Sequence, residues 1–136
     1  MNKIKLVKEY TYMDTLGIEF NVLIYFDEDN ETLLHTLKYI DNNYDTDGYL
    51  LEYEPYSGGN KIYNVIKAFM LDYLESQLNI YINENEYRNL KVVAIKDGLK
   101  VINEKTNQSE TWNIYDFDDD YDDMQYEIMT YLDDNN

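Results

Sequence analysis

Two stretches near the N-terminus alternate between apolar and polar residues with the two-residue period of β-strands. They cover residues 3–12 (KIKLVKEYTY) and 17–26 (GIEFNVLIYF), and both are rich in β-branched and aromatic residues. Residues 14–17 separate them and end in a glycine, so the two stretches are predicted to pair as a hairpin.

The middle of the chain shows the 3.6-residue period of amphipathic helices. A short helix is predicted after Asp29 or Asn30, which can cap it, with its inner face formed by Leu33, Leu34, Leu37 and Ile40. A turn at 45–48, a short strand at 49–54 and a loop at 55–60 follow. Asn60 is then expected to cap a long helix over about 61–79, whose apolar stripe comprises Ile62, Val65, Ile66, Phe69, Met70, Tyr73, Leu74 and Leu78.

The last third of the chain returns to strands and ends in a helix. Residues 90–96 and 99–105 flank Asp97-Gly98, which is a strong hairpin signal, and a third strand is predicted over 111–117. A C-terminal helix over about 119–132 is predicted with Asp118 as its cap. The expected fold is therefore one α+β domain, 1–136, in which the long helix packs on an antiparallel sheet of about five strands, with two shorter helices.

The composition fits a folded chain without covalent cross-links. Its 136 residues are 44% hydrophobic and 15% aromatic, which is far more than a disordered acidic chain contains. The absence of cysteine excludes disulfides, thiolate metal sites and a cysteine nucleophile. No apolar run approaches the ~18 residues of a membrane span, and the N-terminus lacks the apolar centre of a signal peptide. The heavy use of Asn, Ile, Lys and Tyr is typical of an AT-rich coding sequence, so the cytoplasm of a bacterial host is the expected location.

Charge restricts the class of partner. The chain has 28 acidic and 11 basic residues, a net charge of -17, and no Lys or Arg follows Lys105. The segment 106–136 contains ten carboxylates. Such a surface repels nucleic-acid phosphates and anionic membranes, so direct binding to either is not expected. Basic proteins and cations are the natural partners.

The predicted C-terminal helix would carry an apolar face and an acidic face at the same time. Tyr121, Met124, Ile128, Tyr131 and Leu132 share one side, and carboxylates spaced by about one turn share another. The surface could imitate phosphates and bind in the basic groove of a nucleic-acid-binding protein, or it could be a solvated face that only confers solubility. The residues expected to contact a partner are Asp116, Asp118, Asp119, Asp120, Tyr121, Asp122, Asp123, Tyr126 and Glu127. The tyrosines would serve as anchors among the acids.

The segment Asp116 to Met129 (DFDDDYDDMQYEIM), together with the overall charge, resembles small DNA-mimic inhibitors of phages and mobile elements, including some anti-CRISPR proteins. That resemblance implies a protein that blocks the DNA-binding channel of an effector nuclease. An immunity protein that neutralises a nuclease toxin is an alternative that the sequence does not separate from this one. Oligomeric state stays open.

Residues 43–54 (NYDTDGYLLEYE) offer a different class of function. Set against an EF-hand loop, Asn43, Asp45 and Asp47 fall at the first three ligand positions, Gly48 at the turn and Glu54 at the bidentate position. The pattern departs from the motif because Leu51 is apolar where a ligand is usual and a proline follows the loop. A calcium-binding module, or a plain turn entering a strand, would account for the segment.

Nothing in the sequence indicates an enzyme. The single histidine, His35, together with the absence of cysteine, leaves no basis for the common catalytic triads or for multi-histidine metal sites. The glycine-rich segment 57–60 lacks the lysine of a phosphate-binding loop and is predicted to be a loop before a helix. We therefore expect no catalytic residues and no cofactor other than a possible calcium ion.

Overall fold

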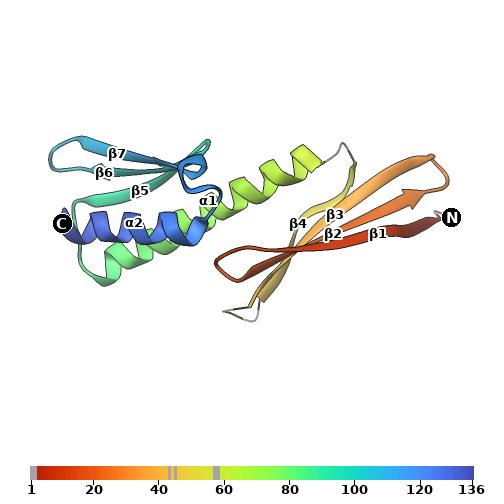
Figure 1. Cartoon of the computed structure of the whole chain (residues 1–136), viewed down its shortest axis with the longest axis horizontal. Helices are drawn as coiled ribbons and strands as arrows, with labels where there is room; N and C mark the ends of the chain where they lie inside the picture. The colour runs from red at the N-terminus through yellow and green to blue at the C-terminus, as the bar shows by residue number, and fades with distance from the viewer. Residues whose placement is uncertain (1–2, 43, 45, 57–58) are drawn as a thin grey trace. The chain divides into compact units, whose positions relative to one another are not determined.

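The computed structural model describes residues 3–42, 44, 46–56 and 59–136. The chain divides into two compact units, Met1–Val65 and Ile66–Asn136, and the division falls inside the long helix α1 (Gly59–Glu84). Each unit contains its own antiparallel sheet (Figure 1). The predicted α+β class is confirmed, but a four-stranded and a three-stranded sheet replace the single sheet of about five strands.

The sheet of the first unit is a meander in which each strand pairs with the next. Its strands are β1 (Ile4–Met13), β2 (Ile18–Asp27), β3 (Thr32–Asp41) and β4 (Thr46–Pro55). The predicted turn between β1 and β2 is present. The amide of Gly17 donates to the carbonyl of Asp14 at 3.0 Å, and Gly17 has a φ of 83°, which glycine adopts without strain.

The helix predicted around residues 33–40 is wrong, because this segment is strand β3 and pairs with β2 over its whole length. Leu33 and Leu37 are four residues apart and satisfy a helical as well as a two-residue period, so periodicity alone does not separate the two structures. The expected caps belong to the hairpin turn instead. Asp27 accepts hydrogen bonds from the Asp29 amide at 3.1 Å and from the Asn30 side chain at 2.8 Å.

One face of this sheet is buried and one edge is open. Ile18, Phe20, Val22 and Ile24 alternate along β2 with less buried residues, as a strand with one buried face requires. Every residue of the edge strand β1 is exposed, although several are apolar. Lysines and a bulge between Leu6 and Lys8 are features that discourage such an edge from pairing with other chains.

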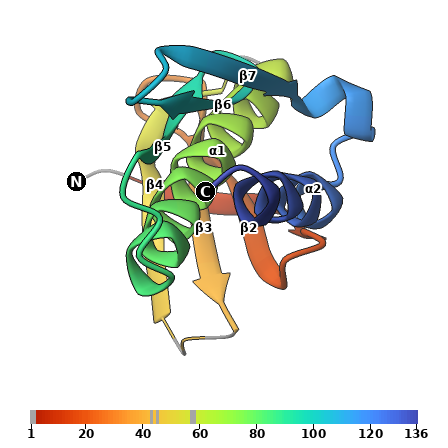
Figure 2. The same ribbon diagram turned by 90° about the vertical axis from the view of Figure 1, so that its left-hand side faces the viewer.

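The second unit contains the rest of α1 and the C-terminal elements. These are β5 (Leu90–Ile95), β6 (Gly98–Asn103), β7 (Gln108–Asn113), the 3-10 helix η1 (Ile114–Phe117) and α2 (Tyr121–Asp134). The predicted meander is confirmed, although residues 114–117 leave the third strand as η1. Both helices lie on the same side of the three-stranded sheet (Figure 2). Strand β7 approaches β6 closely at position 98 and requires glycine there, because a Cβ would lie 1.8 Å from the Trp112 carbonyl oxygen.

Side chains of α1 occupy the free edge of this sheet. The Asn79 amide group donates to the Val92 carbonyl at 2.9 Å and accepts from the Val92 amide at 3.0 Å, and the Glu75 carboxylate accepts from the Ala94 amide. These bonds satisfy backbone groups of β5 that would otherwise be available for pairing. Helix α1 itself extends beyond the predicted 61–79 at both ends and begins at Gly59, ahead of the expected cap at Asn60.

Candidate acidic interface

The acidic segment begins with two short turns that fix the direction of α2. The Asn113 side chain accepts from the Tyr115 amide at 2.9 Å and so caps η1. Asp118 and Asp119 then both adopt left-handed backbone conformations, with φ of 52° and 62°. Aspartate tolerates this region better than most residues because its side chain can bond locally. The predicted cap Asp118 therefore ends η1, and Asp120 is the residue that caps α2.

Four of the five residues predicted for the apolar face of α2 are buried, whereas Tyr131 is half-buried, and the buried stripe includes one residue that is also predicted at the interface. The stripe consists of Tyr121, Met124, Ile128 and Leu132. Tyr121 is only 2% exposed, because its position at the first turn of α2 falls on the same helix face as the other three. Tyr121 is thereby removed from the candidate contact residues.

The remaining acids and one tyrosine form a surface that we call the acidic interface, in which every residue is exposed except the half-buried Asp119 and Asp120. It comprises Asp116, Asp118, Asp119, Asp120, Asp122, Asp123, Tyr126 and Glu127. Tyr126 is 71% exposed and lies one helical turn after Asp122 and Asp123. Within the described residues, Asp116, Asp118, Asp123 and Glu127 make no ion pair with a base of the chain. Their charges are therefore not neutralised internally.

Two acids of the segment stabilise the fold through hydrogen bonds within the protein. The Asp120 carboxylate accepts from the Asp123 amide at 3.1 Å, which is the N-cap bond of α2. Near the other end of α2, Asp133 accepts from the hydroxyls of Tyr81 at 2.5 Å and Tyr87 at 2.8 Å. The bond from Tyr81, followed by the bond from Tyr87, lowers the pKa of Asp133. These two acids hold α2 in place, so they are poor candidates for partner contacts.

A lysine of α1 anchors the start of the acidic segment. The Lys67 ammonium group donates to the Tyr115 hydroxyl at 3.0 Å and to Asp97 at 2.7 Å. Tyr115 is 49% exposed, so its ring remains accessible while its hydroxyl is held. The acidic interface is consequently attached to the core of the second unit at Tyr115 as well as along the buried stripe.

The calcium-loop interpretation of residues 43–54 is not supported. Asn43 and Asp45 lie outside the described residues, but Asp47 and Glu54 belong to the extended strand β4, roughly 23 Å apart at ~3.3 Å per residue. An EF-hand ion needs both ends of its loop around one centre and a helix before it, whereas β3 precedes this segment. Asp47 instead pairs with Lys38 at 3.3 Å. No group of three potential metal ligands occurs among the described side chains.

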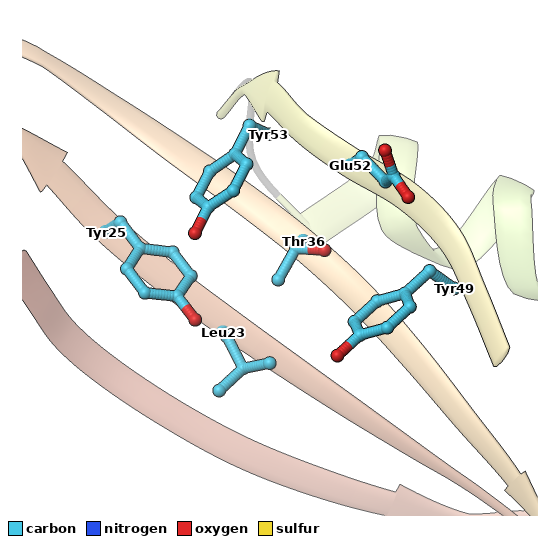
Figure 3. A pocket seen from close by; sticks show the side chains of 6 residues that line it. All are labelled: Leu23, Tyr25, Thr36, Tyr49, Glu52 and Tyr53. Carbon is cyan, nitrogen blue, oxygen red and sulfur yellow. The ribbon is translucent and has the colours of Figure 1, made fainter. Parts of the chain in front are cut away.

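The four-stranded sheet carries a second feature that the sequence did not reveal. A hollow of about 320 Å³ lies on it, which we call the tyrosine hollow, lined by Leu23, Tyr25, Thr36, Tyr49, Glu52 and Tyr53 (Figure 3). These residues come from three strands and no motif connects them. The only signal available was the unusual number of tyrosines, sixteen in the chain.

No family model, curated protein or solved structure matches this chain significantly. Across the part of the chain that the structure describes, neither helix has the length and apolar character needed to cross a bilayer.

Proposed function

We propose that the protein is a small acidic inhibitor that imitates nucleic-acid phosphates and occupies the basic groove of a nuclease or another DNA- or RNA-binding protein, as an anti-CRISPR or anti-defence protein would. The observation that carries this proposal is a set of exposed carboxylates on and just before a folded helix, Asp116, Asp118, Asp123 and Glu127, which make no ion pair among the described residues. Charge-assisted bonds from such carboxylates to Arg and Lys would replace the bonds that those groups make to phosphates.

The geometry of α2 suits a groove that holds a phosphate backbone. Asp123, Glu127 and Asp134 are exposed along the helix and span about 16 Å at 1.5 Å per residue. Asp116 and Asp118 extend the charge to the preceding turn. The exposed ring of Tyr126 supplies apolar area among the carboxylates, which is the usual character of an interface anchor. A net charge of -17 would also speed encounter with a basic partner.

Competition with nucleic acid is the direct test. The immobilised protein would capture partners from a bacterial lysate at low and at high salt. Each captured protein would then be bound to fluorescently labelled DNA or RNA and titrated with the inhibitor. We expect displacement of the nucleic acid, weakening as salt rises. A captured protein that binds the inhibitor and the nucleic acid simultaneously would contradict the proposal.

Two triple variants that each remove three negative charges test whether inhibition depends on the acidic interface or only on net charge. Asp116→Asn, Asp123→Asn and Glu127→Gln together remove three charges of the acidic interface while leaving the cap Asp120 intact. Asp72→Asn, Glu84→Gln and Glu104→Gln remove three exposed charges elsewhere in the second unit. The first set should weaken inhibition roughly ten-fold or more, and the second by much less. Equal effects of the two sets would mean that only net charge matters and would refute a shaped mimic.

A further inference from the structure

The tyrosine hollow lies in the first unit, away in sequence from the acidic interface. β2 contributes Leu23 and Tyr25, β3 contributes Thr36, and β4 contributes the remaining three residues. Figure 3 shows the Tyr25 and Tyr49 hydroxyls directed toward Leu23 from opposite sides, and the Tyr53 hydroxyl directed toward Tyr25. Tyr49 and Tyr53 are more than half exposed, so the rings are accessible from solvent.

An irregularity of β4 brings an acid and an aromatic ring to the same place. His35 pairs with Glu54 and Leu37 with Leu51, so Glu52 and Tyr53 both fall opposite Thr36. The Thr36 hydroxyl donates to the Leu51 carbonyl across this bulge. In a regular strand, adjacent residues point to opposite faces, but a bulge redirects one of them.

The backbone at this bulge is in an unusual conformation. Tyr53 has a φ of 44°, which is rare for a bulky residue and unfavourable outside glycine, asparagine and aspartate. Strain of this kind persists where the surrounding structure enforces it, and it is frequent at binding sites. Here it holds the Tyr53 ring with its centroid 5.3 Å from that of Tyr25, tilted by 57°.

The chemistry of the hollow favours a cation. Tyrosine faces attract ammonium and guanidinium groups, and Glu52 adds a carboxylate that makes no ion pair within the described residues. Among the described side chains, no Lys or Arg lines the hollow. A contact between a cation and a tyrosine ring is already present beside the hollow, within the same sheet. The Lys38 ammonium lies 5.9 Å from the Tyr49 ring centroid while pairing with Asp47.

The ionisation state of Tyr25 fits the same chemistry. Burial raises the pKa of Tyr25, and the neighbouring rings of Tyr53 and Tyr49 and the charge of Glu9 raise it further. Tyr25 therefore stays a neutral phenol at physiological pH, with its ring face available. The volume is at the low end of the roughly 300–1,000 Å³ usual for ligand pockets, which suits one side chain better than a large molecule.

We propose that the tyrosine hollow receives the guanidinium or ammonium group of an exposed Arg or Lys on a basic protein partner. The cation would lie against the Tyr25 and Tyr53 rings and pair with Glu52. A nucleic acid is disfavoured here, because Glu52 and the net charge of -17 repel phosphates. The inference does not rest on the acidic interface, since none of its residues takes part.

A peptide titration tests the proposal without knowledge of the partner. The probe is an acetylated, amidated Gly-Ser peptide with three arginines, and the matched control contains citrulline, which keeps the shape and removes the charge. Binding is followed by the aromatic NMR signals of the tyrosines at low salt. We expect the Tyr25 and Tyr53 signals to shift with the arginine peptide only. Equal shifts with citrulline, or no shift at millimolar arginine peptide, would overturn the proposal.

Variants inside and outside the tyrosine hollow test whether the arginine peptide binds there. Tyr25→Leu and Glu52→Gln should each weaken binding about three- to ten-fold, and Tyr25→Phe, which retains a ring, should weaken it less. Tyr44→Leu and Asp29→Asn change an exposed ring and an exposed charge of the same unit outside the hollow and should have little effect.

The triple variant of the acidic interface should bind the arginine peptide in the hollow as the unmodified chain does, even if that variant no longer inhibits a partner. Loss of the tyrosine shifts in the triple variant would overturn the proposal, because it would show general electrostatic attraction. Amide dispersion in the NMR spectrum verifies that each variant is folded.

Discussion

The Lys67 ammonium group lies 2.7 Å from the Asp97 carboxylate, and Lys67 is only 7% exposed. This pair joins α1 to the turn between β5 and β6, and the same ammonium holds the hydroxyl of Tyr115 at the start of the acidic segment. The bond to Asp97, and then the bond to Tyr115, raise the pKa of Lys67, so the lysine stays charged. A buried charge of this kind stabilises the unit only while its partner is present.

Removal of Asp97 should therefore destabilise the second unit. Asp97→Ala leaves the Lys67 charge without its carboxylate, and we expect a loss of about 1–3 kcal/mol in the free energy of unfolding, moderated because Asp97 is partly exposed. Urea denaturation followed by circular dichroism gives this value. In the double variant Lys67→Met and Asp97→Ala, much of the stability should return, because no buried charge remains. Two additive losses would contradict a direct interaction.

A buried histidine makes the first unit sensitive to acid. His35 is 0% exposed, and neither ring nitrogen has a hydrogen-bond partner among the described residues. The Tyr56 ring lies edge-on at 5.7 Å. Burial lowers the pKa of His35, and the charge of Lys61 lowers it further, while Glu54 opposes the shift. The unfolded chain then binds the proton more readily, so stability is lost as pH falls below about 6.5.

The variant His35→Leu isolates this contribution from that of the many carboxylates. The difference in unfolding free energy between the unmodified chain and the variant should be constant above pH 7.5. Below pH 6.5 the unmodified chain should lose stability relative to the variant as the pH falls. This relative loss should stop once the pH is low enough to protonate His35 in the folded state. Urea titrations at half-unit steps from pH 5 to pH 8 measure the difference. A difference that does not vary with pH would show that His35 is not protonated on unfolding.

The local hairpins could be predicted from the sequence because each is encoded by its own residues. The Asp97-Gly98 pair and the turn before Ile18 both lie between alternating segments, and each pairing needs no information from elsewhere in the chain. Strand β3 could not be predicted in this way. Leu33 and Leu37 fit both periods, and pairing with β2 decides the outcome.

The candidate sites also differ in whether neighbouring residues or distant strands determine them. The carboxylates of the acidic interface are contiguous in sequence, so their charge was evident. The helical spacing also placed Tyr121 on the apolar face of α2, and its burial there rules out the second role, as an interface anchor, that its acidic neighbours suggested. The tyrosine hollow could not be predicted at all. It requires Tyr25 and Tyr53 from non-adjacent strands, and the bulge that aligns them is set by tertiary pairing.

Titration of Tyr81 tests the attachment of α2 to α1. The hydrogen bond to Asp133 raises the pKa of Tyr81 to about 12, because ionisation of the phenol would break it and place two negative charges together. Absorbance at 295 nm should therefore show the half-buried Tyr81 ionising late in an alkaline titration. In Asp133→Asn the pKa should fall toward 10, whereas Asp134→Asn, one residue along, should leave it unchanged. A high pKa retained in Asp133→Asn would rule out the carboxylate as its cause.

Variants at the N-terminus of α2 test which acids of the acidic interface stabilise the fold. Because the Asp120 carboxylate accepts the Asp123 amide, Asp120→Ala should destabilise the second unit by about 1 kcal/mol. Asp123→Ala removes an exposed carboxylate of the first turn but keeps the Asp123 amide that donates to the cap, so it should have a smaller effect, chiefly through the helix dipole. Thermal melting of both variants measures the difference. If Asp120→Ala melts like Asp123→Ala, the cap bond contributes nothing. In that case Asp120 would rejoin the acids whose charge serves only a partner.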